Sequence, residues 1–204
     1  GRMSIWGNLA LRYEGRENQA HRLLALDGGG IRGIITLEVL NRMEELLAET
    51  TGRGASFRLC DFFDYVAGTS TGAIIAAGLA LGMSATELLD FYKQTGPAMF
   101  DKQFILKRWQ ALYKSQPLKK ELQETFGAHT TLGSGDLKCL LMAVTRNRTK
   151  DSPWPISSNP QAKYNDRKRP DCNLQIPLWQ IVRASTAAPV FFPPEVIQWD
   201  PDDE

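Results

Sequence analysis

One five-residue stretch, Gly68-Thr69-Ser70-Thr71-Gly72, constrains the fold of this chain more than any other. It stands between an aromatic, β-branched run at 62–67, which suits a buried strand, and an Ala- and Ile-rich run at 73–81, which suits a buried helix. A Gly-x-Ser-x-Gly between a strand and a helix is typical of a nucleophile elbow, a sharp turn that exposes the serine beside the free amides at the start of the helix. The motif predicts a catalytic Ser70; the alternative is a tight turn whose serine only caps the helix.

A second glycine-rich turn lies at Asp27-Gly28-Gly29-Gly30-Ile31-Arg32-Gly33. A short apolar run at 22–26 precedes it and predicts a strand, and apolar residues at helical spacing follow it from Ile34 to Thr51. Two successive strand–turn–helix units predict an α/β fold with a mostly parallel central sheet flanked by helices. In such a sheet both turns fall at the edge formed by the carboxyl ends of the strands, where ligand sites gather.

The glycine-rich turn has three interpretations. The spacing Gly28-x-Gly30-x-x-Gly33 is that of dinucleotide-binding folds, but the next strand ends in Ala67-Gly68-Thr69, without the carboxylate that holds a ribose. A P-loop needs a Gly-Lys-Ser/Thr sequence, which does not follow here. Consecutive glycines also expose backbone N–H groups that can bind an oxyanion, and beside a serine turn they favour an oxyanion hole. Arg32 would orient that loop or bind an anionic headgroup; the alternative is a surface arginine in an ion pair.

Ser70 needs a general base, and the residues alone leave its identity open. His21 precedes a strand and therefore lies at the wrong edge of the sheet, while His129 sits in a polar loop, where we expect it to be solvated. An aspartate acting directly on the serine is the other option. Such an aspartate would need burial or apolar neighbours to raise its pKa toward working pH.

Two further segments make the pattern specific. Ala184-Ser185-Thr186-Ala187-Ala188-Pro189 is followed by Phe191-Phe192-Pro193, and with the two glycine-containing turns these segments resemble the patatin-like phospholipase family over residues 21–198. The resemblance implies a three-layer α/β sandwich that hydrolyses acyl esters in lipids through a Ser–Asp dyad, without calcium, another metal or a cofactor. By motif, Ser70 is the nucleophile. The oxyanion loop is Gly28, Gly29, Gly30 and Arg32, and the supporting positions are Asp27, Gly33, Gly68 and Gly72.

The chain departs from the family at the second member of the dyad. The family's catalytic aspartate stands in an Asp-Gly-Gly or Asp-Gly-Ala turn after the Phe-Phe-Pro-like segment. Here the only Asp-Gly is Asp27-Gly28, and Asp200, Asp202 and Asp203 are not followed by glycine. We therefore expect an N-terminal extension at 1–20 and, at 21–204, an acyl hydrolase domain truncated before its aspartate and weak or inactive by itself. The alternative is a catalytically dead module that binds lipid or a partner.

Composition limits the other partners. The chain of 204 residues has a formal net charge of +1, which implies no general affinity for nucleic acid. No apolar run reaches the roughly 20 residues of a membrane span, and three cysteines without Cys-x-x-Cys spacing argue for a reducing compartment. We expect a cytoplasmic protein that meets a membrane surface transiently and acts on a phospholipid or another acyl-ester lipid. The aromatic and basic segment Met99–Tyr113 either contacts lipid or forms a half-buried helix.

Periodicity and turn residues predict the remaining elements. We expect helices at 84–95, opened by a Ser84-x-x-Glu87 capping box, at 117–126 and at 177–185. We expect strands at 138–145 and, at the sheet edge, at 154–157.

Overall fold

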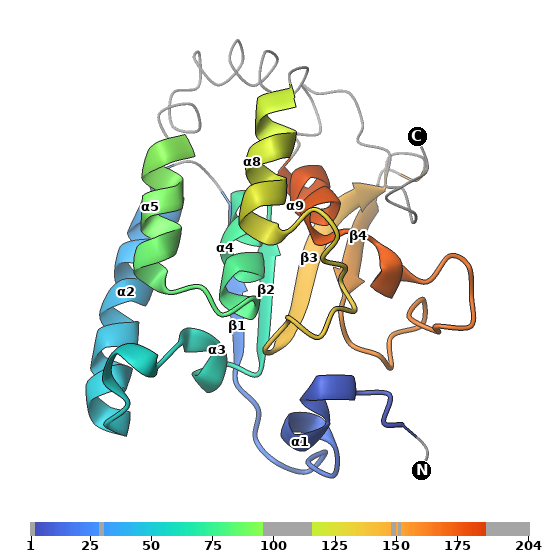
Figure 1. The fold of residues 1–204 in the computed structure, drawn as a ribbon, viewed down its shortest axis with the longest axis horizontal. Helices are drawn as coiled ribbons and strands as arrows, with labels where there is room; N and C mark the ends of the chain where they lie inside the picture. Colours follow the sequence, from blue (N-terminus) through green and yellow to red (C-terminus); the bar gives the residue numbers. More distant parts are fainter. Residues whose placement is uncertain (1–2, 29–30, 96–115, 148–149, 151, 187–204) are drawn as a thin grey trace.

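The structure, a computed structural model, describes residues 3–28, 31–95, 116–147, 150 and 152–186 (Figure 1). Within them, four strands form one sheet in the order β1-β2-β3-β4. The strands are β1 (Leu23–Leu26), β2 (Tyr65–Thr69), β3 (Leu140–Asn147) and β4 (Ser152–Ser157). The α-helices are α1 (Ala10–Tyr13), α2 (Ile31–Thr51), α3 (Leu59–Phe62), α4 (Thr71–Ala80), α5 (Ala85–Thr95), α8 (Gln116–Phe126) and α9 (Leu178–Thr186), with short 3-10 turns at Gly7–Leu9, Gly54–Ser56 and Asn173–Gln175.

The first three strands run parallel and the fourth is antiparallel. Leu26 pairs with Gly68 at the end of β1, and Thr69 pairs with Val144 at the end of β2, whereas β4 returns along β3 in the opposite direction. The carboxyl ends of β1 and β2 therefore meet at one edge, and each is followed by one of the two glycine-containing turns. This arrangement confirms the predicted α/β fold with a mostly parallel sheet flanked by helices.

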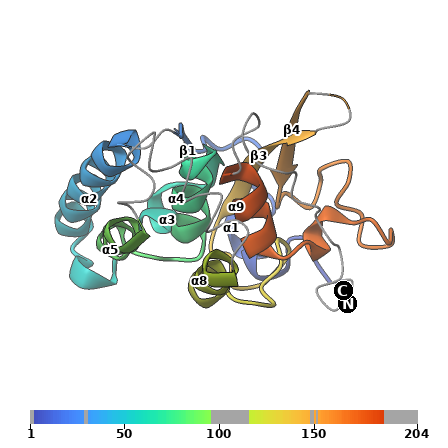
Figure 2. The same cartoon turned by 90° about the horizontal axis from the view of Figure 1, so that it is seen from above.

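Helix α4 is the centre of the core. All ten of its residues are buried, as expected of a helix that is apolar around its whole circumference. It packs on β1, β2 and β3, and α9 packs beside it on β3. Seen from above, α4 and α9 lie on the same side of the sheet with α8 outside α9, while α2 and α5 pair at the side where β1 forms the sheet edge (Figure 2). The helix that follows Ser70 is thus held on every side.

The segment before β1 makes specific contacts with the rest of the fold. The guanidinium of Arg12 donates to the carbonyls of Cys60 (2.5 Å), Phe63 (2.6 Å) and Lys138 (2.9 Å). The same guanidinium lies 3.3 Å from the carboxylate of Asp64. These contacts gather at the edge where β2 and β3 begin, opposite the edge that carries Ser70 (Figure 1). The expected domain start at residue 21 stays a prediction.

The observed elements differ from the expected ones mainly before β2. The apolar run at 62–67 predicted a strand, but its first residue ends the short helix α3, and β2 begins at Tyr65 and continues through Thr69. Asp61 explains the helix, since its carboxylate accepts the Arg58 amide (3.0 Å) at the helix start. The segment Met99–Tyr113 and everything after Thr186, including Phe191-Phe192-Pro193, lie outside the described residues.

Candidate active site

Ser70 occupies a strained turn between β2 and α4. Its backbone has φ 53° and ψ −127°, and among the described residues it is the single non-glycine residue with positive φ. Such a conformation costs about 1–3 kcal/mol and persists only where the surrounding structure enforces it. The half-buried side chain stands at the N-cap of α4 without capping it through a hydrogen bond. The capping alternative therefore has no support from the geometry, and the strain is of the kind found at functional sites.

The two glycines of the serine turn are required by close backbone contacts. A Cβ at Gly68 would overlap the carbonyl of Gly72, and a Cβ at Gly72 would overlap the carbonyl of Leu26 at the end of β1. The turn is thus pressed against itself and against the neighbouring strand. This is the physical reason for glycine two residues before and two residues after Ser70.

The glycine-rich loop reaches the serine turn directly. A Cβ added at Gly28 would lie 2.5 Å from the Ser70 Cβ and 2.7 Å from the Thr69 carbonyl oxygen, so the loop backbone passes immediately beside the serine. Asp27 precedes it with an exposed side chain. Gly29 and Gly30 lie outside the described residues. The structure therefore brings the first glycine of the predicted oxyanion loop to Ser70.

The start of α2 connects the glycine-rich loop to the serine turn through Tyr92. Arg32 is exposed on α2, whereas Gly33 is buried and packs so closely on the ring of Tyr92 that an added Cβ would lie 2.6 Å from it. The Tyr92 hydroxyl in turn donates to the carbonyl of Thr71 (2.9 Å). Burial raises the pKa of Tyr92 to about 12, so the hydroxyl remains a donor at neutral pH. The sequence placed Tyr92 only on a helix and assigned it no role.

Ser185 contacts the serine turn from the other side. The amide of Ser70 donates to the Ser185 hydroxyl (3.2 Å), and that hydroxyl donates to the carbonyl of Val144 (2.8 Å). Ser185 is buried in the last turn of α9. The sequence places Ser185 in a family motif but indicates no role for its side chain.

Neither histidine reaches Ser70. His21 lies at the opposite edge of the sheet, where its Nδ1 is 3.7 Å from the Asp64 carboxylate. His129 is exposed next to Thr130, whose carbonyl accepts the amide of Leu178 at the start of α9. About 10 Å of helix axis separates Leu178 from the α9 residue that contacts the serine turn. Within the described residues, no carboxylate or imidazole hydrogen-bonds the Ser70 hydroxyl.

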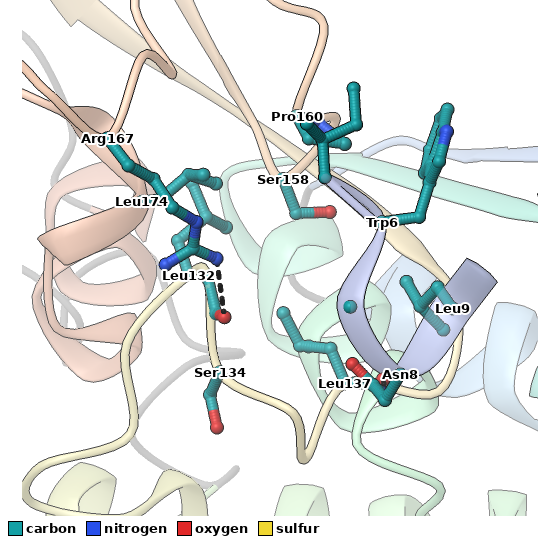
Figure 3. A pocket seen from close by; sticks show the side chains of 13 residues that line it. Trp6, Asn8, Leu9, Leu132, Ser134, Leu137, Ser158, Pro160, Arg167 and Leu174 are labelled. Atoms are coloured by element: carbon teal, nitrogen blue, oxygen red, sulfur yellow. Dashed lines mark hydrogen bonds between the residues drawn. The ribbon is translucent and has the colours of Figure 1, made fainter. Parts of the chain in front are cut away.

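A small cavity lies away from this site, between the N-terminal segment and the loop before β3. It has a volume of about 50 Å³, with Trp6 and Asn8 on one side and Leu132 and Arg167 on the other (Figure 3). The Arg167 guanidinium donates to the carbonyl of Gly133 (3.3 Å) across its rim. That volume suits one or two water molecules. None of the predicted site residues lines this cavity.

The described ranges contain neither a group of metal-binding side chains nor a membrane-spanning helix. There, no three side chains from His, Cys, Asp and Glu come together as a group that could hold a metal ion. No helix within those ranges has the length and apolar character needed to cross a membrane.

Fold and site together define an α/β protein in which a strained serine turn abuts a glycine-rich loop at the carboxyl edge of a parallel sheet. The family model of patatin-like phospholipases matches residues 24–200. The chain therefore belongs to the patatin-like phospholipase family.

Proteins similar to this chain are consistent with the family assignment. A cGAMP-activated phospholipase of Vibrio cholerae serotype O1 is 33% identical over 195 residues, which cover 89% of this chain and 52% of the relative. An 85/88 kDa calcium-independent phospholipase A2 of Rattus norvegicus is 30% identical over 189 residues, covering 87% of this chain and 22% of the relative. Among solved structures, VipD from Legionella pneumophila aligns with 84% of this chain and 43% of its own, with a TM-score of 0.46 and 18% identity. The chain thus spans about half, or less, of the curated relatives it matches.

Proposed function

We propose that Ser70 is the nucleophile of a lipid ester hydrolase whose substrates are phospholipids. The observation that carries the proposal is the strained backbone of Ser70 directly beside Gly28, whose missing side chain leaves the loop backbone in contact with the serine. The relatives that are named as phospholipases support phospholipids as the substrate class. We extend phospholipid substrates to this chain, and we propose that it contacts a membrane surface transiently to reach them.

The proposed reaction has two halves. The Ser70 hydroxyl attacks the ester carbonyl, the base takes its proton, and backbone amides of Gly28, Gly29 and Gly30 bind the oxyanion. Collapse of the tetrahedral intermediate breaks the ester bond, and the base returns the proton to the leaving lysophospholipid alcohol. Water, activated by the same base, then attacks the acyl-enzyme and releases the fatty acid.

Two further groups of the proposed site are the general base and Arg32. An aspartate is the base that the family resemblance implies, and neither histidine competes for the role, since each lies remote from Ser70. Arg32 extends from the exposed side of α2, where its guanidinium orients the loop or binds the phosphate of a lipid headgroup. No metal ion is needed in this scheme, because hydrogen bonds from backbone amides stabilise the developing negative charge.

A fluorophosphonate probe tests the nucleophile directly, since it forms a covalent bond with an activated serine. We expect the full-length protein to be labelled at Ser70 and to release fatty acid from phosphatidylcholine vesicles, and we expect Ser70→Ala to abolish both. Ser158→Ala is the control, because it removes a different serine hydroxyl, one that is buried and accepts the amide of Leu141, remote from the elbow. Equal labelling of wild type and Ser70→Ala would refute the assignment.

The same experiment separates the enzyme from a dead binding module. A full-length protein that binds the vesicles, but neither takes up the probe nor releases fatty acid, is the binding module. If the full-length protein is active, replacing each aspartate by asparagine in turn identifies the base. Only the substitution of the dyad aspartate should abolish turnover while the protein stays folded.

A further inference from the structure

Ser185 is the one buried hydroxyl in the described residues that bonds the backbone of Ser70 itself. It accepts the Ser70 amide at 3.2 Å and donates to the Val144 carbonyl at 2.8 Å. Thr69 and Val144 are the last registered pair between β2 and β3. The Ser185 hydroxyl therefore bridges the two strands directly beyond the point where their backbone pairing stops.

The bridge has a fixed direction. A serine hydroxyl has a single proton, and the Val144 carbonyl can only accept it, so the Ser185 oxygen presents a lone pair to the Ser70 amide. One partner is a backbone carbonyl of β3 and the other is the amide of the residue directly after β2, and Ser185 itself is held by α9, which packs on β3 and α4. The Ser70 amide thus has a partner whose position cannot relax independently of the core.

This contact explains how the strained conformation of Ser70 is maintained. On its C-terminal side the Ser70 carbonyl accepts the amide of Ala73 (3.0 Å), which lies in the first turn of α4. On its N-terminal side the chain has just left the β2–β3 ladder, and the Ser185 hydroxyl supplies the bond that the ladder would otherwise provide. With both backbone groups of Ser70 bound, its φ and ψ are determined from two directions.

We propose that Ser185 is a positioning residue for the nucleophile, an inference that rests on the proposed role of Ser70. Its hydroxyl holds the Ser70 backbone in the strained conformation that aims the side chain at the ester carbonyl and keeps it beside Gly28. It does not touch the substrate. Because reaction rates depend steeply on the placement of the reacting atoms, loss of this hydroxyl lowers kcat more than it changes KM.

The test uses four variants of the full-length protein. Ser185→Ala removes the hydroxyl, Ser185→Cys keeps nearly the same size with a much weaker hydrogen-bonding group, and Ser185→Thr restores a hydroxyl. Ser158→Ala is the control, because it also removes a buried hydroxyl that accepts an amide of the same sheet. We expect kcat and the rate of fluorophosphonate labelling to fall about 10- to 100-fold in the Ala and Cys variants, with KM within about threefold of wild type. We expect Thr to recover most of the rate and Ser158→Ala to leave it unchanged.

A second measurement does not require turnover. The hydrogen exchange rate of the Ser70 amide reports the bond to Ser185, and we expect it to rise at least tenfold in Ser185→Ala but not in Ser158→Ala. An unchanged exchange rate, or unchanged kcat in an active protein, overturns the role of Ser185. A wild type that shows protected exchange but neither labelling nor hydrolysis refutes the proposed function, while the exchange data still decide whether Ser185 holds the turn.

Discussion

Tyr92 and Thr71 connect two turns that lie far apart in the sequence. The Tyr92 hydroxyl donates to the Thr71 carbonyl at 2.9 Å, and the same ring fills the space where Gly33 has no side chain. One buried tyrosine on α5 thus contacts the first turn of α2, which follows the glycine-rich loop, and the first turn of α4, which follows Ser70. The spacing between loop and nucleophile depends on this side chain.

Tyr92→Phe tests that dependence with the smallest change. The ring still packs on Gly33, but the hydrogen bond to Thr71 is lost, so we expect the free energy of unfolding to fall by about 1 kcal/mol. We also expect a severalfold decrease in kcat, since α4 loses one of the groups that fix its start. Tyr65→Phe is the matched control, because the Tyr65 hydroxyl bonds Ser157 at the far end of β2. Equal losses of kcat in the two variants would show that Tyr92 contributes only stability.

We expect Gly28→Ala to lower the rate of hydrolysis strongly while changing the thermal stability of the protein little. The new Cβ would lie 2.5 Å from the Ser70 Cβ and 2.7 Å from the Thr69 carbonyl oxygen, so the loop must move away from the serine. A displacement of about 1 Å in such a site lowers the rate about 100-fold. Steady-state hydrolysis and thermal unfolding measure the two effects separately. Gly135→Ala is the control, because its Cβ would meet nothing nearer than 3.8 Å, and we expect it to behave as wild type.

The parts of the site that could be predicted from the sequence are those encoded by local pattern. Glycine spacing around Ser70 and around Gly28 reports backbone turns that need the absence of a Cβ, and apolar runs on either side report strand and helix. The structure places these turns together because parallel strands bring their carboxyl ends to one edge. The fold class follows from the same alternation.

The parts that could not be predicted depend on contacts between distant residues. Ser185 is 115 positions from Ser70, and nothing in the local pattern of α9 shows which strand its hydroxyl faces. Tyr92 stands at a helical spacing from other apolar residues, as any core residue of a helix does. Arg12 lies in a polar stretch, from which an N-terminal extension was predicted. A strand was also expected from residue 62, where α3 ends, because aromatic residues suit both a strand and a short buried helix.

Buried phenols and thiols make the fold sensitive to alkaline pH. Burial raises the pKa of Tyr92 to about 12 from 10.0, and raises that of the Cys139 thiol to about 12 from 9.0. A group whose folded pKa lies above its unfolded pKa contributes stability below the unfolded value and loses it as pH rises toward the folded value. We therefore expect the melting temperature to fall progressively from pH 9 toward pH 12. In Tyr92→Phe this slope should be shallower above pH 10, whereas Tyr164→Phe, at a surface position, should keep the wild-type slope.

Arg12 provides the test of whether residues 1–20 are an extension or part of the folded unit. Its guanidinium donates to three backbone carbonyls and pairs with Asp64, so Arg12→Ala leaves those acceptors without their charged donor. We expect the free energy of unfolding to fall by about 2–3 kcal/mol, and we expect Arg12→Lys to recover little, because an ammonium cannot serve several diverging carbonyls at once. Arg42→Ala is the control, since Arg42 pairs with Glu45 on the exposed face of α2 and should change stability by less than about 0.5 kcal/mol. Denaturant titrations that give Arg12→Ala and Arg42→Ala the same small effect would mean that the segment is peripheral and that the folded unit begins near residue 21.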